Sequence, residues 1–187
     1  MPAHRVSVVL MAAVGLTGVS SGLLAGPAVR RLGAPACDGQ DVDPWVTELR
    51  DRVEAYNGLA RFAQGRFGPP IACEGKVTAE FDGVRFGSLV LGYSGGVALS
   101  VETMPPETSI VVLSAAMGFD AEPLVVEALR AYALGVGLRL DWTHPEVTTT
   151  GDEVSETFWD PESGLNASAS LIRSGGVLRS VRLAMAL

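Results

Sequence analysis

Residues 83–104, GVRFGSLVLGYSGGVALSVETM, form the stretch on which the interpretation of the whole chain depends. This apolar run is interrupted at its centre by residues 92–96. On both sides of the interruption, apolar residues alternate with small or polar ones, which is typical of β-strands. The centre therefore has two interpretations: it is a tight turn between paired strands, or it is a turn that presents Ser94 as a nucleophile.

Strand patterns continue on either side of this stretch. Residues 76–81 alternate and end at Asp82-Gly83, a strong signal for a β-hairpin. Residues 85–91, 97–103 and 109–115 follow as further strands. Residues 138–142 alternate briefly before a loop that holds Pro145 and a run of threonines. Residues 154–159, 165–173 and 177–187, linked by turn-forming segments, predict an antiparallel meander at the end of the chain.

Two segments carry apolar residues at helical spacing. The first is residues 45–63, with Asp43 as a candidate N-cap, Pro44 in the first turn, and Gly65 and Gly68 at the end. The second is residues 120–133, with Asp120 as the candidate cap. The sequence thus predicts the order helix, strands, helix, strands.

The two halves of this order resemble each other in sequence. Each helix contains Val-Glu-Ala and is followed by similar strand segments. Residues 77–81 correspond to residues 154–158, residues 88–90 to 170–172, and residues 94–101 to 174–181. We therefore predict an α+β fold in which an antiparallel sheet packs against two helices, built as a duplicated unit of one helix and three or four strands. In outline this order is similar to secretion-chaperone-type folds.

The first 36 residues differ from the rest. A short basic start is followed by an uncharged apolar run over residues 6–26, the layout of a secretory signal peptide. The run is also about 20 residues long, enough to span a bilayer as an N-terminal membrane anchor. We expect residues 1–36 to be one or the other, and residues 37–187 to be a single domain exported to the periplasm, the cell envelope or the extracellular space.

The exported part is acidic. From Cys37 onward it has 11 basic and 21 acidic residues, a net charge of −10. Such a surface repels nucleic acid and anionic membrane faces. We therefore expect no nucleic-acid partner, and basic ligands, proteins or cations remain open as partners.

Cys37 and Cys73 are the two cysteines of the chain. In an oxidising compartment they are expected to pair, which would tie the start of the domain to the end of its first helical segment. The alternative is two buried thiols. Two cysteines with one histidine after residue 36 do not suggest a zinc site.

The motif Gly92-Tyr93-Ser94-Gly95-Gly96 fits G-x-S-x-G. Residues 83–115 resemble the nucleophile turn of α/β-hydrolases, in which the serine lies between a strand and a helix. The resemblance implies a catalytic triad of Ser94, His144 as the base, and Asp120 or Asp141 as the orienting acid. It also implies a helix directly after Gly96. The turn interpretation instead predicts a strand there and a distant His144.

Residues 141–162 hold seven acidic residues and no Lys or Arg. Asp160, Glu162 and Asn166 are spaced so that a turn could gather them around calcium, but this segment lacks the EF-hand pattern. No nucleotide-binding or HExxH motif is present, so we expect neither a cofactor nor a metal. The sequence therefore favours a non-catalytic envelope module that binds a protein or a small apolar ligand through its sheet face. The alternative is a small secreted serine hydrolase of the esterase type.

Overall fold

A computed structural model describes residues 49–50, 52–104, 108–162 and 164–186, all of which belong to one compact unit of the chain. The predicted signal peptide or anchor, Asp43, Pro44 and Cys37 lie outside these residues. The two long helices are α2 (Glu54–Phe67) and α3 (Glu122–Gly135). The strands are β1 (Ala72–Phe81), β2 (Val84–Tyr93), β3 (Val97–Met104), β4 (Thr108–Ala115), β5 (Glu146–Thr150), β6 (Glu153–Asp160), β7 (Gly164–Ser174) and β8 (Val177–Ala186).

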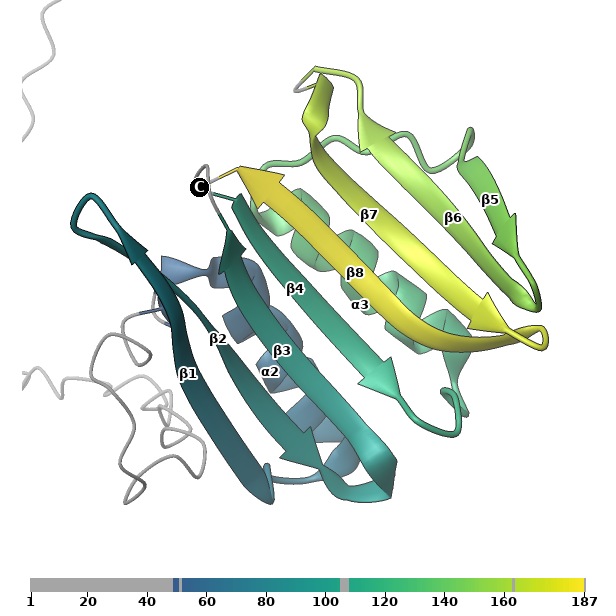
Figure 1. Cartoon of the computed structure of the whole chain (residues 1–187). Coiled ribbons are helices and arrows are strands. Elements are labelled where there is room, and N and C mark those ends of the chain that lie inside the picture. The colour runs from purple at the N-terminus through teal and green to yellow at the C-terminus, as the bar shows by residue number, and fades with distance from the viewer. Residues whose placement is uncertain (1–48, 51, 105–107, 163, 187) are drawn as a thin grey trace, which may run out of the picture. The chain divides into compact units, whose positions relative to one another are not determined.

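All eight strands form one antiparallel sheet in the order β1-β2-β3-β4-β8-β7-β6-β5. Both helices lie on the same face of this sheet (Figure 1), where α2 packs on β2, β3 and β4 and α3 packs on β7 and β8. The predicted α+β class, with an antiparallel sheet against two helices, is confirmed. Within the described ranges, no helix combines the length and the hydropathy needed to cross a bilayer.

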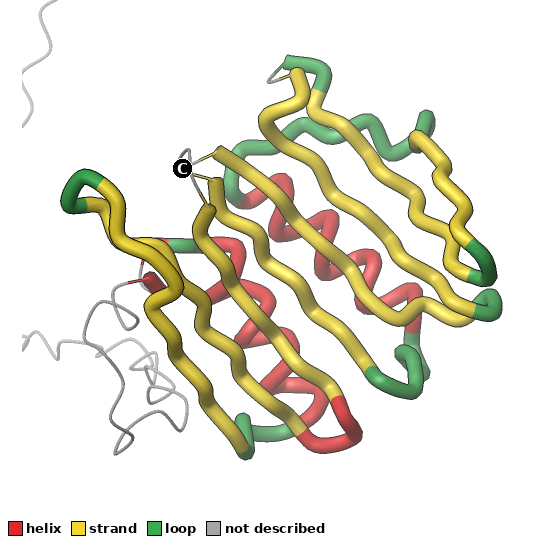
Figure 2. Tube along the Cα trace, viewed as in Figure 1, coloured by secondary structure: helices red, strands yellow, loops and turns green. Residues whose placement is uncertain are grey.

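The topology repeats a unit of one helix and four strands. α2 precedes β1 to β4, α3 precedes β5 to β8, and the two four-stranded halves join where β4 pairs with β8 (Figure 2). The strand order is therefore symmetric about this junction, with β1 matching β5 and β3 matching β7. The sequence similarities instead align β1, β2 and β3 with β6, β7 and β8. That correspondence is wrong by one strand, because it followed two similar Ser-Gly-Gly turns rather than the order of the strands.

The helix boundaries differ from the predicted ones. The chain is helical at residues 49–50 and 52 but is broken at Val53, which has extended dihedral angles (φ −100°, ψ 92°), so α2 starts at Glu54. It then continues through Gly65 and ends at Gly68, whose φ of 85° suits glycine. Asp120 is not the cap of α3, because Ala121 occupies that position and makes no side-chain cap hydrogen bond.

The hydrophobic core lies between the helices and the sheet. Along β2, β3 and β4 every second side chain points into it, which is the alternation that the sequence shows. The two helices approach closely at Gly58, where a Cβ atom would lie 2.2 Å from Cδ1 of Tyr132. The largest fully buried side chains are those of Tyr56, Leu59, Leu89, Leu91, Leu99, Leu113, Leu129, Leu178, Leu183, Val53 and Val101.

The β1–β2 connection is the predicted hairpin. Asp82 and Gly83 both have positive φ angles, 51° and 76°, as a two-residue turn of the favoured type requires. Two predictions around β5 are wrong. The run of threonines forms the edge strand β5 rather than a loop, and residues 138–142 form no strand, although the Asp141 amide donates to the Trp159 carbonyl.

Candidate functional site

The turn around Ser94 joins two strands. Residues 94–96 form a single 3-10 turn in which Gly95 and Gly96 have φ angles of 75° and 72°, and β3 begins directly at Val97. The helix that the nucleophile-turn hypothesis expects after Gly96 is absent, so that expectation is wrong. Ser94 Oγ donates a hydrogen bond of 2.6 Å to the carbonyl oxygen of Phe67, the last residue of α2. The serine therefore stabilises the end of a helix.

His144 and Asp141 do lie together, as the triad hypothesis predicts for that pair. His144 Nδ1 is 2.8 Å from Asp141 Oδ2 and 2.9 Å from Thr143 Oγ1. The hydroxyl and amide of Thr143 donate to the Asp141 carboxylate, and these bonds, with the one from His144, hold the pKa of Asp141 well below its usual range. The His144 side chain is 83% exposed. This is a solvated turn that precedes β5.

The sheet keeps Ser94 and His144 apart. Ser94 follows β2, whereas His144 precedes β5, and in the sheet β3, β4, β8, β7 and β6 lie between those two strands. The path from β2 to β5 therefore has six strand-to-strand steps. At about 4.8 Å per step, it amounts to roughly 29 Å across the sheet. Asp120 lies in the turn before α3, where the amide of the neighbouring Phe119 donates to the Leu178 carbonyl at the start of β8, whereas His144 precedes β5. The three members of the predicted triad are not assembled into one site.

The carboxylates considered for calcium are occupied by protein donors. Asp160 is buried and accepts hydrogen bonds from the backbone amides of Arg139 and Glu162. Glu162 forms an ion pair with Arg139 at 3.3 Å. Among the described residues, no group of three or more His, Cys, Asp or Glu side chains is arranged to hold a metal ion. Asp160 therefore secures the turn after β6.

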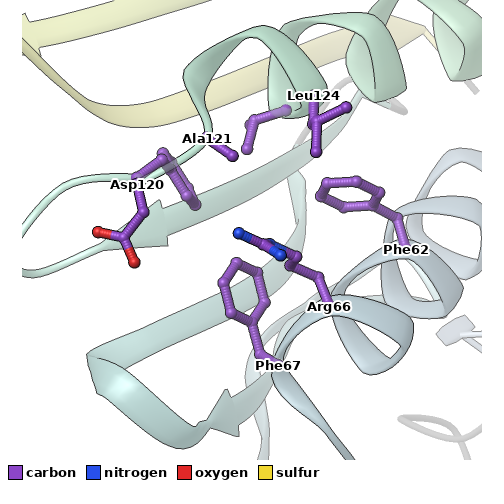
Figure 3. Close-up of a pocket in the computed structure, with 8 residues that line it drawn as sticks. Phe62, Arg66, Phe67, Asp120, Ala121 and Leu124 are labelled. Atoms are coloured by element: carbon purple, nitrogen blue, oxygen red, sulfur yellow. The ribbon is translucent and has the colours of Figure 1, made fainter.

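A small hollow lies between the end of α2 and the start of α3. Figure 3 shows Phe62, Arg66 and Phe67 of α2 facing the first residues of the second helix. Its interior volume is about 10 Å³, which leaves room for roughly one water molecule. The hollow is too small for an organic ligand.

A larger groove lies beside α3. It encloses about 770 Å³, within the roughly 300–1,000 Å³ range of ligand pockets. α3 packs on β7 and β8, so β6 extends beyond the edge of the helix and forms a floor next to it. The wall on α3 consists of Glu122, Pro123, Val126, Glu127 and Arg130, and the floor consists of Glu156, Phe158, Leu171 and Arg173.

An ion-pair network crosses this groove. Arg173 on β7 donates to Glu122 of α3 and to Glu156 of β6. Burial disfavours the charged guanidinium, but the hydrogen bonds that Arg173 donates to both carboxylates outweigh this effect and raise the pKa of Arg173. Glu122 lies 51 positions and Glu156 lies 17 positions before Arg173 in the sequence, so no local pattern signals the network.

The opposite face of the sheet contacts neither helix, and we call it the open face. Figure 1 looks onto this face, with both helices behind the strands. The registers place these side chains on its central strands: Ala98, Ser100, Glu102 and Met104 of β3; Thr108, Ile110, Val112 and Ser114 of β4; Ser180, Arg182 and Ala184 of β8; and Ser168, Ser170 and Ile172 of β7. Glu102 and Arg182 are the charged residues in this set, and the others are small, β-branched or apolar.

These surfaces define the class of protein. It is an α+β domain with an open sheet face, weakly charged over its four central strands, on one side and a charged groove beside a helix on the other. Comparison of the chain with protein-family models, with curated proteins and with solved structures found no match.

Proposed function

We propose that the chain is a non-catalytic binding module of an exported or membrane-anchored protein, and that a protein partner docks on the open face. The observation that carries this proposal is the position of both helices on the other side of the sheet. A sheet of this kind has one face packed on the core and leaves the second for solvent or for a partner.

The composition of the open face supports a protein partner. Charged residues are depleted at the centres of protein interfaces, and the central strands of this face carry charges at Glu102 and Arg182 alone among the positions named above. Short, β-branched side chains also lose little conformational entropy when a partner immobilises them. The open face of all eight strands covers roughly 1,000 Å², and the four central strands supply about half of it. A standard interface buries roughly 800 Å² per partner, so a partner centred on this face would also cover part of the outer strands.

The shape of the open face favours a protein over a small apolar ligand. Small ligands bind in concave sites, and the two hollows described above are lined by residues of the helices and of the helix-bearing side of the sheet. The esterase alternative rests on the G-x-S-x-G motif alone, since β3 follows Gly96 directly and Ser94 and His144 are far apart in the fold.

The test is site-specific photo-cross-linking in the cells that produce the protein. A photoreactive phenylalanine analogue replaces Val112 at the centre of the open face, and the control places it at Leu134, which is 70% exposed on α3. We expect one discrete adduct from position 112 and none of that mass from position 134. Arg182, which pairs with Val112 in the sheet register, supplies the specificity control: Arg182→Glu should reduce the adduct severalfold.

Two outcomes would count against the proposal. One is the absence of any adduct from position 112, and the other is the same set of adducts from positions 112 and 134. An adduct of twice the chain's mass, formed by the purified protein, would identify a second copy of the chain as the partner.

A further inference from the structure

The groove beside α3 has acceptor atoms that the ion-pair network does not use. Arg173 binds Oε1 of Glu122 and Oε2 of Glu156. A carboxylate accepts hydrogen bonds at both of its oxygens, and the second oxygen of each glutamate has no protein donor among the described residues. Two carboxylates and one guanidinium leave this cluster with a net charge of −1.

The remaining charges of the groove keep it negative. Glu127 adds a second acidic group to the wall. Arg130 lines the same wall, with its guanidinium over the Trp142 ring, 4.9 Å from the ring centroid, so the three glutamates and two arginines of the groove sum to a net charge of −1. Besides Glu156, the neighbouring residues 141–162 contain six further acidic residues and no Lys or Arg, so the surrounding field attracts cations.

The floor of the groove is apolar between these charges. Phe158 and Leu171 are buried and belong to the core, and Phe158 packs on Trp142 with ring centroids 4.7 Å apart. Val126 of α3 faces them across the groove and is partly buried. The groove therefore combines an apolar floor with carboxylate acceptors at one end.

We propose that this groove binds a small organic cation: a primary amine that carries an apolar chain. The ammonium group donates to the free oxygens of Glu122 and Glu156, and the chain lies on Phe158 and Leu171. An ammonium has three donors and no acceptor, which matches a site that offers acceptors. An anion of the same shape is disfavoured, because two carboxylates already neutralise Arg173. This site is on the opposite side of the sheet from the open face and does not depend on the proposed partner there.

Three probes of equal chain length separate charge from hydrophobicity. Hexylammonium, hexanol and hexanoate are titrated into the isotopically labelled full chain, and binding is followed by amide and indole chemical shifts in NMR spectra. We expect hexylammonium to bind at least fivefold more tightly than hexanol, and hexanoate to cause no saturable shift. The shifts should map to α3, β6 and β7 and to the Trp142 indole, and should spare the Trp159 indole, which donates to Glu146.

Charge-removing variants test the roles of the carboxylates. Glu122→Gln and Glu156→Gln keep an oxygen that can accept from Arg173, and each should weaken hexylammonium at least fivefold. The matched control is Glu146→Gln, which removes the same charge from the neighbouring strand β5, where Glu146 pairs with Thr157 on the other face of the sheet. That variant should stay within twofold of the parent.

A blocking variant covers the case in which Gln substitution disturbs the network. Val126→Phe fills the groove without altering any charge and should abolish the saturable shifts while the other amide signals stay in place. Equal affinities for hexylammonium and hexanol, an equal loss in Glu146→Gln, or shifts that persist in Val126→Phe would each overturn the proposal.

Discussion

Ser94 Oγ donates a hydrogen bond of 2.6 Å to the carbonyl oxygen of Phe67, so the turn between β2 and β3 is tied to the last residue of α2. The final carbonyl groups of a helix have no partner within the helix. Ser94 supplies one from a turn 27 residues further along the chain. The glycines around it serve the same turn, because Gly95 and Gly96 both adopt positive φ angles.

Ser94→Ala should therefore lower the stability of the domain. Removal of the hydrogen bond should lower the free energy of unfolding by about 1 kcal/mol, at an exposed site where water can replace part of the bond. Urea unfolding of the full chain measures this change. Ser180→Ala, which removes a serine hydroxyl from the open face, is the control and should change the free energy of unfolding by less than about 0.5 kcal/mol.

The same Ser94 variant tests the hydrolase alternative. A fluorophosphonate should form no adduct with the folded parent protein under conditions that label a control hydrolase, because His144 lies too far from Ser94 to act as its base. A stoichiometric adduct at Ser94, lost in Ser94→Ala and weakened in His144→Ala, would overturn the binding-module proposal.

The contact between Gly58 and Tyr132 sets the spacing of the two helices. In Gly58→Ala the new methyl group would meet the tyrosine ring at 2.2 Å, so the helices must separate or the ring must move. We expect a loss of about 1–3 kcal/mol in the free energy of unfolding, as is typical of overpacked sites. Thermal and urea unfolding of the variant give the measurement.

Gly65→Ala is the matched control on the same helix. No atom lies within 4 Å of the added Cβ position at Gly65, so helix propensity alone should stabilise this variant by about 0.5–1 kcal/mol. If the two substitutions changed stability equally, the close approach at Gly58 would not limit the packing of α2 on α3.

The strands around Ser94 could be predicted because their signals are local. Alternation in β2 and β3 reflects a core on one face and a weakly polar open face on the other, and Asp82-Gly83 specifies its own turn. β5 has no such alternation, because all five of its residues are exposed and neither face imposes an apolar period. The sequence pattern therefore did not predict this strand. Residues 138–142 alternate because Leu140 is buried and Trp142 packs on Phe158, without a strand being formed.

The candidate sites depend on contacts between residues far apart in the sequence, which a linear pattern does not contain. G-x-S-x-G suggested a nucleophile, and only the element that follows Gly96 distinguishes that from a turn. The groove depends on Arg173 meeting Glu122 and Glu156, which come from three different elements. Those charges looked like ordinary surface residues in the sequence, since no spacing rule links α3 to β6 and β7.

Tyr56 is fully buried in α2, and its hydroxyl has no hydrogen-bond partner among the described residues. A buried hydroxyl without a partner costs about 1–3 kcal/mol. Tyr56→Phe should therefore raise the free energy of unfolding at pH 7 by about 1 kcal/mol. Tyr132→Phe, at a partly exposed position, should change it by less than about 0.5 kcal/mol. A loss of stability in Tyr56→Phe would mean that the hydroxyl has a partner in solution, such as a bound water.

The same tyrosines should govern the stability of the domain at alkaline pH. Burial raises the pKa of Tyr56 above its ordinary value, and it raises the pKa of Tyr93 to about 12. Because the folded pKa exceeds the unfolded value of about 10, this contribution to stability is complete below pH 10. It is lost as the pH rises from 10 through 12 for Tyr93. Urea unfolding between pH 9 and 11.5 should show the decline, and Tyr93→Phe and Tyr56→Phe should each make it shallower.

Cys73 is the second residue of β1, is buried, and pairs in register with the core residue Leu91. Its predicted partner, Cys37, lies outside the described residues, so their pairing stays a prediction. A disulfide would close the loop that contains α2, and the chain-entropy model gives a stabilisation of about 3–4 kcal/mol for a loop of this length.

Alkylation of the unfolded, unreduced protein should add no mass, and alkylation after reduction should add two groups. Cys37→Ser removes the cross-link while leaving the packed Cys73 side chain in place, so reduction should lower the unfolding free energy of the parent but not of this variant. Two alkylated cysteines without reduction, in protein folded under oxidising conditions, would show that the domain is held together by its core alone.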